Sequence, residues 1–290
     1  MLKHFFRSIS KLGDKYMFLK DNFLWRKIRI YYNYIKFLNF EANFDVPKEN
    51  SISFYTQNIE RIKLIANILA DEKSKNILLG LIKFRQTHNK KDFPFCPIKE
   101  EQYFFKEIKL NKDEVFIDCG AYIGDTIYKF KKRCRKYKQI VAFEPDSINF
   151  DKLKEKYENN KKITLINACV GEKEGKLAFS SQQGQGSGVV ADDLYGKRNV
   201  ISIPVKTIDD LNLEPVSFIK MDIEGEELNA LKGAEKTILR DKPKLAICIY
   251  HSDEDMIRIA EYIHSIVPEY KLYVRHYGFV YETVLYAIMP

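Results

Sequence analysis

Cysteine pairs and long apolar runs are missing from this sequence of 290 residues. Its five cysteines are widely spread and form no C-x-x-C pair, which argues against a disulfide framework and against a structural zinc site. No apolar run approaches the ~20 residues that a membrane-spanning helix requires. The basic N-terminus, MLKHFFRSISKLGDKY, has no continuous apolar core and does not resemble a secretory signal. We therefore expect a globular, cytoplasmic protein.

Positive charge is concentrated at one end of the chain. The formal net charge is +8, and residues 1–40 alone carry nine Lys or Arg against two Asp. Aromatic residues interleave with these charges, so this basic arm could bind anionic lipid, or pack on the main domain or on a second copy of the chain. Because no nucleic-acid motif accompanies the charge, we expect no nucleic acid as a partner. Peripheral membrane contact or a homodimer through the N-terminal segment is expected instead.

The sequence pattern changes near residue 110. Residues 52–90 place apolar side chains at i, i+3, i+4 and i+7, which predicts helix. Beyond about residue 113, short apolar runs alternate with amphipathic charged stretches, the pattern of a parallel sheet with helices on both faces. We therefore divide the chain into a helical N-terminal segment, 1–108, which includes the basic arm 1–40, and an α/β domain, 109–290.

Five short runs have the apolar character of strands that are buried on both faces. They are VFIDC (115–119), IVAFE (140–144), ITLIN (163–167), SFIKMD (217–222) and KLAICIY (244–250). Helical stretches are expected at 125–137, 147–160 and 226–240. Residues 176–181 and 201–207 suggest extra strands around a Gly/Ser-rich loop, and YKLYVRH with ETVLYAI predicts a closing hairpin with an antiparallel edge strand.

A glycine turn follows the first of these strands. VFIDCGAYIGDT (115–126) has the order strand, turn, helix start that is typical of nucleotide-binding sheets. Gly120 and Gly124 permit a sharp turn. The middle glycine of the G-x-G-x-x-G pattern, which lets a pyrophosphate approach the backbone, is replaced by Tyr122. This replacement argues against NAD or FAD and suits a nucleoside ligand without a phosphate, such as S-adenosylmethionine.

An acidic residue ends the second predicted strand, where ribose hydroxyls are bound in such sheets. Glu144, in FEPD (143–146), lies 26 residues after Asp118. Its carboxylate could accept hydrogen bonds from both hydroxyls of a ribose, whether in NAD or in S-adenosylmethionine. The glycine turn and this acid support each other because they occur in the right order.

Four motifs together resemble one family of enzymes. DCGAYIGDT, AFEPD, NACVG (167–171) and IKMDIEGEELNALKGAE are similar, as an ordered set, to the FkbM family of S-adenosylmethionine-dependent methyltransferases over roughly residues 110–250. The resemblance implies a class I methyltransferase fold, which is a Rossmann-like α/β sheet of seven mostly parallel strands with an antiparallel final strand. It also implies methylation of a hydroxyl, often on a sugar or a secondary metabolite.

The resemblance further implies where the methyl donor binds. The first motif and Glu144 would hold its methionine and ribose parts, Asn167 and Ala168 would lie near the adenine, and Asp222 would lie close to the transferred methyl group. The full set of expected donor-binding residues is Asp118, Gly120, Ala121, Gly124, Asp125, Thr126, Glu144, Pro145, Asn167, Ala168 and Asp222.

A sugar hydroxyl is a poor nucleophile, so its methylation benefits from a base or a metal ion. His251 ends the apolar run LAICIY, on the strand after that of Asp222. If the two strands are neighbours, both side chains project into one crevice. We expect His251 and Asp222 to be catalytic, since an unperturbed histidine pKa of about 6.5 suits a base. The alternative is a histidine that forms only local hydrogen bonds. With Glu224, these residues could also bind Mg²⁺.

Substrate-binding residues are expected around the same crevice. Glu224 belongs to the D-x-E-G-x-E pattern, and Ser187 lies in the polar loop GQGSGVV (184–190), which could close over a sugar. Arg275 and His276, near the closing hairpin, could bind an acidic substrate such as a nucleotide-sugar phosphate, although a charged hairpin rim explains them equally well.

The remaining acids near these motifs are expected to serve helix starts. Glu226 would stabilise a helix N-terminus by ~0.3–1 kcal/mol, and Glu227 could share that role. In HSDED, Ser252 and Asp255 form an S-x-x-D pattern that resembles a capping box, and Asp253 and Glu254 lie where negative charge favours the helix start.

The motifs, with the family that they resemble, therefore predict an S-adenosylmethionine-dependent O-methyltransferase acting on a sugar or nucleotide-linked sugar, in surface polysaccharide biosynthesis. An NAD-dependent sugar oxidoreductase or epimerase is the alternative enzyme, and Tyr122 counts against it. A third alternative is a non-catalytic Rossmann-like module that binds membrane or protein partners through the basic N-terminus. The joint presence of Asp118, Glu144 and Asp222 counts against that alternative.

Overall fold

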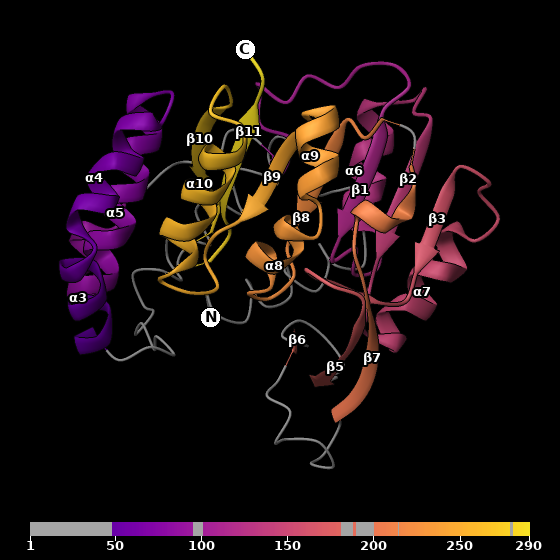
Figure 1. Cartoon of the computed structure of the whole chain (residues 1–290), viewed down its shortest axis with the longest axis horizontal. Helices are drawn as coiled ribbons and strands as arrows, with labels where there is room; N and C mark the ends of the chain where they lie inside the picture. The colour runs from indigo at the N-terminus through magenta and orange to yellow at the C-terminus, as the bar shows by residue number, and fades with distance from the viewer. Residues whose placement is uncertain (1–47, 95–100, 181–187, 190–199, 214, 279–280) are drawn as a thin grey trace, which may run out of the picture.

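A seven-stranded sheet forms the centre of the computed structural model, which describes residues 48–94, 101–180, 188–189, 200–213, 215–278 and 281–290 (Figure 1). Its strand order is β10-β11-β9-β8-β1-β2-β3. The strands are β1 (Val115–Cys119), β2 (Gln139–Phe143), β3 (Ile163–Ile166), β8 (Phe218–Met221), β9 (Lys244–Cys248), β10 (Lys271–His276) and β11 (Thr283–Ile288).

One strand breaks the parallel arrangement of this sheet. The neighbours β9, β8, β1, β2 and β3 pair in parallel, and β11 runs antiparallel to both β9 and β10. The predicted sheet of seven mostly parallel strands with an antiparallel final strand is therefore confirmed. Strand order reverses between β1 and β8, and ligands of such sheets bind in the crevice outside the carboxyl ends at this point.

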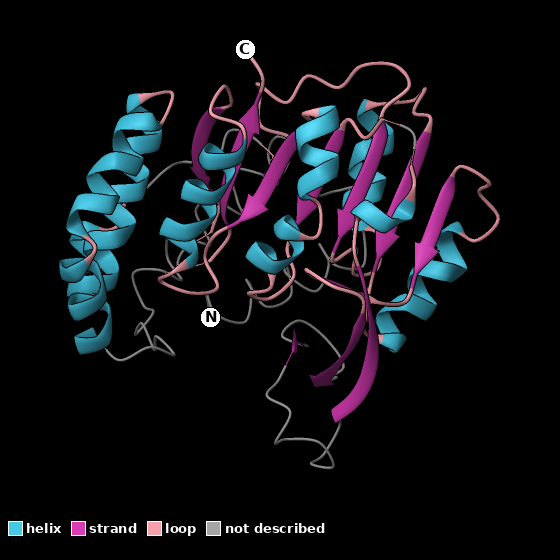
Figure 2. Ribbon diagram, viewed as in Figure 1, coloured by secondary structure: helices cyan, strands magenta, loops and turns pink. Residues whose placement is uncertain are grey.

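Helices cover both faces of the sheet (Figure 2). Phe130 of α6 and Leu153 of α7 belong to the core on one face, and Leu231 of α8, Ile238 of α9 and Ile257 of α10 belong to the core on the other. The bounds are α6 (Asp125–Arg133), α7 (Ser147–Tyr157), α8 (Glu227–Lys232), α9 (Glu235–Asp241) and α10 (Asp255–Ile266), with a short 3₁₀ turn η4 (Asp209–Leu211).

The helical stretch predicted at 226–240 forms two short helices instead of one. The break falls at Gly233, where a Cβ atom would lie 2.0 Å from the carbonyl oxygen of Gly171. Because this backbone passes so close to the helix, only glycine fits there. The close approach joins α8 to the start of the second sheet.

A smaller sheet projects from the carboxyl edge of the large one (Figure 2). Its strand order is β4-β7-β5-β6, and it contains both extra strands predicted from the sequence. The strands are β4 (Cys169–Val170), β5 (Gly175–Ser180), β6 (Gly188–Val189) and β7 (Val200–Lys206).

The N-terminal helices pack beside β10 and α10 (Figure 1). They are α3 (Lys48–Gln57), α4 (Ile59–Ile68) and α5 (Glu72–Thr87), followed by the 3₁₀ turn η2 (Lys90–Asp92). Buried side chains of this helical layer, such as Tyr55 and Leu78, share one core with the sheet. The domain boundary at 108 stays a prediction, and the basic arm 1–40 lies outside the described residues. Within the described ranges, no helix combines the length and apolarity that crossing a membrane requires.

Candidate active site

The ends of β1, β2, β3, β8 and β9 bring the predicted functional residues together. Asp222 follows β8 and donates its backbone N–H to the carbonyl of Cys119 at the end of β1, over 3.1 Å. His251 follows β9, which pairs with β8, and its Nε2 lies 3.5 Å from Asp222 Oδ1. The predicted proximity of Asp222 and His251 is confirmed, while their catalytic role stays a prediction.

The turn after β1 is shaped by close packing between loops. Gly120 has a φ of 80°, and a Cβ atom there would lie 2.0 Å from the carbonyl oxygen of Asp222. Gly124 also has a positive φ and packs against the ring of Tyr157. Glycine is required at both positions because a side chain would be strained and would collide with its neighbour. The protein itself therefore explains both glycines, without a bound donor.

Other expected donor residues in this turn differ in their exposure. Ala121 and Thr126 are buried. Asp125 begins α6, and its partly exposed carboxylate lies 3.6 Å from Lys129 Nζ. Of these three side chains, only that of Asp125 reaches solvent to a large extent.

A buried lysine supports the turn from β8. Lys220 is 2% exposed, lies 3.1 Å from Asp118 Oδ1, and donates to the carbonyls of Cys119 (3.1 Å) and Gly120 (2.7 Å). Burial raises the pKa of Asp118 to about 6, although the Lys220 charge opposes this rise. Burial lowers the pKa of Lys220, but the carboxylates of Asp118 and Asp222 outweigh it and raise that pKa. The fully buried Asp118 carboxylate therefore holds Lys220 and the turn, and its direct contact with a donor stays a prediction.

Glu144 is oriented by backbone groups at the end of β2. It accepts N–H groups from Tyr122 (2.8 Å) and Asp146 (3.0 Å). Burial raises the pKa of Glu144 to about 7, although these two backbone bonds oppose the rise. A carboxylate that titrates near neutrality is thus fixed at the expected ribose position.

The end of β3 is joined to this acid. Asn167 donates its side-chain amide to the carbonyls of Glu144 (2.8 Å) and Pro145 (3.1 Å). Ala168, which follows, is 1% exposed. Asn167 therefore fixes two strand ends against each other, and the predicted adenine contact stays untested.

Two tyrosine hydroxyls hold Asp222. Tyr103 donates to Oδ2 (2.6 Å) and Tyr250 donates to Oδ1 (2.9 Å). Burial favours the protonated carboxyl of Asp222, but Lys220, His251 and the hydroxyls outweigh burial and lower its pKa. Asp222 is therefore ionised, with both oxygens fixed. The motifs missed both tyrosines: Tyr250 ends a predicted strand beside His251, and Tyr103 belongs to no recognised pattern.

The acidic loop after β8 is closed by one of its own glutamates. Glu224 and Gly225 have φ values of 58° and 103°. The fully buried Glu227 accepts the backbone N–H groups of Ile223 (2.8 Å) and Gly225 (3.0 Å). Glu227 therefore stabilises the left-handed turn, a role that its place in the first turn of α8 did not predict. Glu226 lies at the start of that helix as expected.

His251 lies between carboxylates on both sides of its ring. Its Nδ1 is 3.2 Å from Glu227, and its Nε2 is 3.5 Å from Asp222 and 3.6 Å from Glu224. Burial favours the neutral ring, but Glu227 first, and then Asp222 and Glu224, outweigh burial and raise the pKa of His251 to about 9. In the free protein the imidazole is therefore a cation at neutral pH, whereas the sequence suggested an ordinary base.

The sequence suggested that a divalent cation binds at this cluster. Ligand atoms of Asp222, Glu227 and His251 lie within 4.8 Å of one another. However, Glu227 faces Nδ1 whereas Asp222 and Glu224 face Nε2, so the ring separates the carboxylates. The oxygens of Asp222 and Glu227 already accept protein hydrogen bonds. This arrangement does not fit the octahedral oxygen shell of Mg²⁺.

The loop after His251 corrects one expectation. Ser252 and Asp255 exchange backbone-to-side-chain hydrogen bonds of 3.0 Å, so the predicted capping box is confirmed. Asp253 does not serve the helix start. Its carboxylate accepts hydrogen bonds from Ser51, Tyr55 and Arg85 of the N-terminal helices. The sequence separation of these partners hid this contact.

Two expected substrate residues belong to the core instead. The Arg275 guanidinium is 4% exposed and is paired with Asp71 at the start of α5 (2.6 Å). His276 is equally buried, and its Nδ1 lies 2.8 Å from the hydroxyl of Thr283 on β11. The expectation that these residues bind substrate is corrected, because α5 covers this end of the sheet. Ser187 lies outside the described residues.

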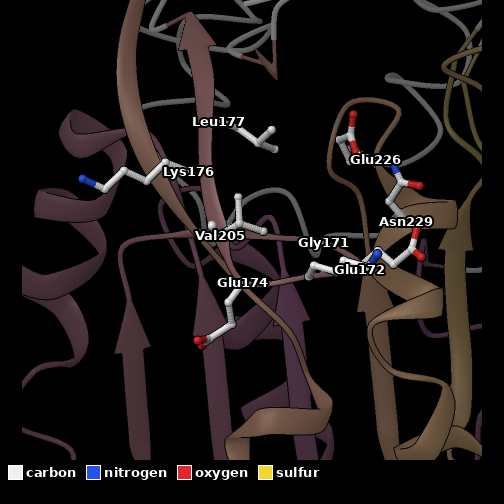
Figure 3. A pocket seen from close by; sticks show the side chains of 10 residues that line it. Gly171, Glu172, Glu174, Lys176, Leu177, Val205, Glu226 and Asn229 are labelled. Atoms are coloured by element: carbon white, nitrogen blue, oxygen red, sulfur yellow. Dashed lines mark hydrogen bonds between the residues drawn. The ribbon is translucent and has the colours of Figure 1, made fainter.

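An open groove of about 330 Å³ adjoins the acidic loop (Figure 3). One wall comes from the start of α8, where Glu226 and Asn229 lie, and the other from the turn after β4 and from β5 and β7. Its lining residues are Gly171, Glu172, Lys173, Glu174, Gly175, Lys176, Leu177, Val205, Glu226 and Asn229. The groove therefore begins two residues beyond Glu224, and its lining includes both apolar and charged side chains.

Together, the sheet topology and the carboxylates at its switch point define a Rossmann-like protein with the class I methyltransferase fold. The chain belongs to the FkbM methyltransferase family, because the methyltransferase FkbM domain matches residues 118–281. This match includes Asp118, Glu144, Asp222 and His251 and confirms the resemblance seen in the motifs.

Known proteins similar to this chain are also methyltransferases by name. The crystal structure of methyltransferase FkbM from Methylobacillus flagellatus KT is 30% identical, with a TM-score of 0.68 over 82% of this chain and 60% of that one. Methyltransferase sdnD of Sordaria araneosa is 25% identical, and the match covers 47% of this chain and 70% of the length of sdnD. Methyltransferase 1 of Beauveria bassiana is 27% identical, and the match covers 47% of this chain and 68% of the length of that relative. The chain thus spans less than two thirds of the solved relative.

Proposed function

We propose that the protein is an S-adenosylmethionine-dependent O-methyltransferase that acts on a hydroxyl of a sugar or nucleotide-linked sugar, in surface polysaccharide biosynthesis. The single observation that carries the proposal is the convergence of Glu144, Asp118 and Asp222 at the ends of the adjacent strands β2, β1 and β8. Family membership supports methyl transfer as the chemistry. Free buried cysteines in the described chain support a reducing, cytoplasmic setting.

These carboxylates suit a donor with ribose hydroxyls and positive charge. Glu144 is already oriented by backbone N–H groups, and its oxygens can accept further bonds from a ribose. Asp222 is ionised and would attract the sulfonium and the ammonium group, while Lys220 and Asp118 support the turn beneath. When bound, the donor supplies an electrophilic methyl group, and the protein mainly positions it against the acceptor.

A sugar acceptor suits the polar residues around the crevice. Carboxylate and amide oxygens accept hydrogen bonds from sugar hydroxyls. Glu224 is exposed beside Asp222, and Glu226 and Asn229 line the adjoining groove (Figure 3). We infer that this groove extends the acceptor site, and Ser187 stays a predicted contact.

His251 is the proposed base, and the neighbouring carboxylates control its protonation state. Only the neutral imidazole can accept a proton, whereas a pKa of about 9 favours the imidazolium in the free protein. The carboxylates that raise this pKa, chiefly those of Glu227, Asp222 and Glu224, would be partly neutralised by a cationic donor. We therefore expect the bound donor to lower the pKa of His251, so that a larger fraction of the imidazole is neutral and able to accept a proton.

The alternative functions have less support. An NAD-dependent sugar oxidoreductase or epimerase would also use Glu144 for ribose, but Tyr122 in the turn and the acidic crevice disfavour a pyrophosphate. A non-catalytic module that binds membrane or protein partners, or a homodimer, would act through the basic arm 1–40. That arm lies outside the described residues, so these partners stay predictions.

Calorimetric titration with S-adenosylmethionine, S-adenosylhomocysteine and NAD tests the donor half. We expect the first two to bind and NAD not to bind. Glu144→Gln should weaken binding, and Glu158→Gln, an exposed glutamate at the end of α7, is the matched control. If neither S-adenosylmethionine nor S-adenosylhomocysteine binds, the proposal is wrong. Mass spectrometry of surface glycans from a deletion strain tests the proposed acceptor. If the acceptor is a surface sugar, a methylated sugar present in the wild-type strain should be missing from the deletion strain.

A further inference from the structure

The loop that carries His251 is held by the N-terminal helices. Arg85 of α5 donates from Nη2 to the carbonyl oxygen of Tyr250 (2.6 Å) and from Nη1 to Asp253 Oδ1 (2.7 Å). One guanidinium therefore bonds to the loop on both sides of His251. A planar fork with several fixed donors can make two such bonds at once, which a lysine ammonium cannot reproduce in the same geometry.

Asp253 completes this clamp, which we define as Arg85, Asp253, Tyr55 and Ser51. The hydroxyls of Tyr55 (2.7 Å) and Ser51 (2.5 Å), both on α3, also donate to the Asp253 carboxylate. The side chains of Arg85 and Asp253 are 11% and 10% exposed. A buried ion pair whose lone pairs are filled by further hydrogen bonds keeps one geometry, because any displacement leaves a charge unpaired in a dry environment.

The clamped loop carries two side chains of the candidate active site. Tyr250 donates its hydroxyl to Asp222 Oδ1 (2.9 Å), and the rings of Tyr250 and His251 lie with their centroids 4.1 Å apart. Because Arg85 bonds to the Tyr250 carbonyl, it fixes the peptide unit that joins these two residues. A shift of that peptide would change the distances of both side chains from Asp222.

We propose that Arg85 is a positioning residue for methyl transfer, which fixes Tyr250 and His251 against Asp222 from the helical layer. The inference rests on the proposed function, and it makes α3 and α5 part of the active-site framework. The competing explanation is that Arg85 only attaches the helices to the sheet. Arg61 does attach them: in the described chain its side chain bonds to Glu261 of α10 and to Asn58, and neither of these belongs to the site.

Arg85→Lys and Arg61→Lys in the full-length protein separate the two explanations. The chain has only five histidines, so the ring Cε1–H signal of His251 can be assigned by NMR with a His251→Gln reference. At pH 7.5 we expect Arg85→Lys to move this signal by several line widths and Arg61→Lys to leave it in place. The affinity for S-adenosylhomocysteine, measured by calorimetry, should stay within about threefold in both variants.

Each outcome decides between the explanations. If Arg85→Lys moves the His251 signal no further than Arg61→Lys does, the proposal is overturned. If Arg85→Lys does not fold, Tyr55→Phe replaces it, because this change removes one hydrogen bond to Asp253 and keeps the aromatic ring. If the His251 signal does not move in Tyr55→Phe, the proposal is likewise overturned. Failure of the wild type to bind S-adenosylhomocysteine overturns the proposed function instead, and the NMR comparison still tests the clamp.

Discussion

Replacing His251 by glutamine should make the stability of the protein less dependent on pH. In the wild type, carboxylates of Asp222, Glu224 and Glu227 lie 3.2 to 3.6 Å from the ring nitrogens. Burial opposes the charged ring, but these carboxylates outweigh it and raise the pKa from 6.5 to about 9. At about 1.4 kcal/mol per pKa unit, this difference corresponds to about 3 kcal/mol of stabilisation.

The sign follows from the direction of the change in pKa. The folded-state pKa of His251 lies above its unfolded value, so the stabilisation is complete below about pH 6.5 and is lost as the pH rises through about 9. We would measure the free energy of unfolding in urea at about pH 6 and pH 9.5. The wild type should lose about 3 kcal/mol more than His251→Gln over this range. Alkaline titration of the cysteines affects both proteins and cancels in the comparison.

Parallel pH dependences in the two proteins would refute this reasoning, because the histidine would then gain nothing from its neighbours. An NMR titration of His251 provides a second measurement on the same protein. A midpoint near 6.5 would mean that the carboxylates do not surround the ring in solution. It would also remove the basis for a donor-controlled base.

Three further measurements address the donor site and the proposed base. Gly120→Ala should lower the free energy of unfolding by more than about 2 kcal/mol, because the new Cβ atom would collide with the carbonyl oxygen of Asp222. Thermal unfolding measures this loss, and Gly175→Ala is the control because open space surrounds the position of its Cβ. The affinity for S-adenosylhomocysteine should fall by up to about tenfold per pH unit below 7, because ribose binding favours ionised Glu144, and Glu144→Gln should flatten this dependence. His251→Ala should lower turnover while donor affinity, measured by calorimetry, stays within a few fold; equal losses of both would exclude a role as base.

The sequence predicted the sheet well because its signals are local. The parallel strands β1, β2, β8 and β9 are largely buried on both faces and appear as short runs of mainly apolar residues, interrupted by Asp118 in β1 and Lys220 in β8. The edge strand β3 is partly exposed, although its run looked equally buried in the sequence. The glycine turn and the acids fall at strand ends, so strand order alone brings them to one edge of the sheet. Asp222 and His251 could be placed together for the same reason.

The contacts that the sequence did not reveal join residues far apart in the chain. Tyr103 and Asp222 are separated by 119 positions, and Arg85 and Asp253 by 168. No periodicity encodes such a pair, since each partner alone looks like an ordinary surface or core residue. Arg275 was misassigned for the same reason, because its partner Asp71 belongs to another predicted segment.

The charges at the carboxyl edge also disfavour a dinucleotide ligand. Four carboxylates, on Asp118, Asp222, Glu224 and Glu227, surround the two cations Lys220 and His251. This local excess of negative charge would attract a sulfonium and repel a pyrophosphate. Two like charges 4 Å apart cost about 4 kcal/mol at an effective dielectric constant of about 20.

Tyr122→Gly therefore should not create an NAD site, even though it restores the middle glycine of the dinucleotide pattern. The substitution is compatible with the fold, because Tyr122 has a φ of 51°, a conformation that glycine adopts readily. Calorimetry with NAD should show no binding to the variant, while S-adenosylhomocysteine still binds. Tight NAD binding would mean that the tyrosine side chain, and not the charge of the crevice, excludes dinucleotides.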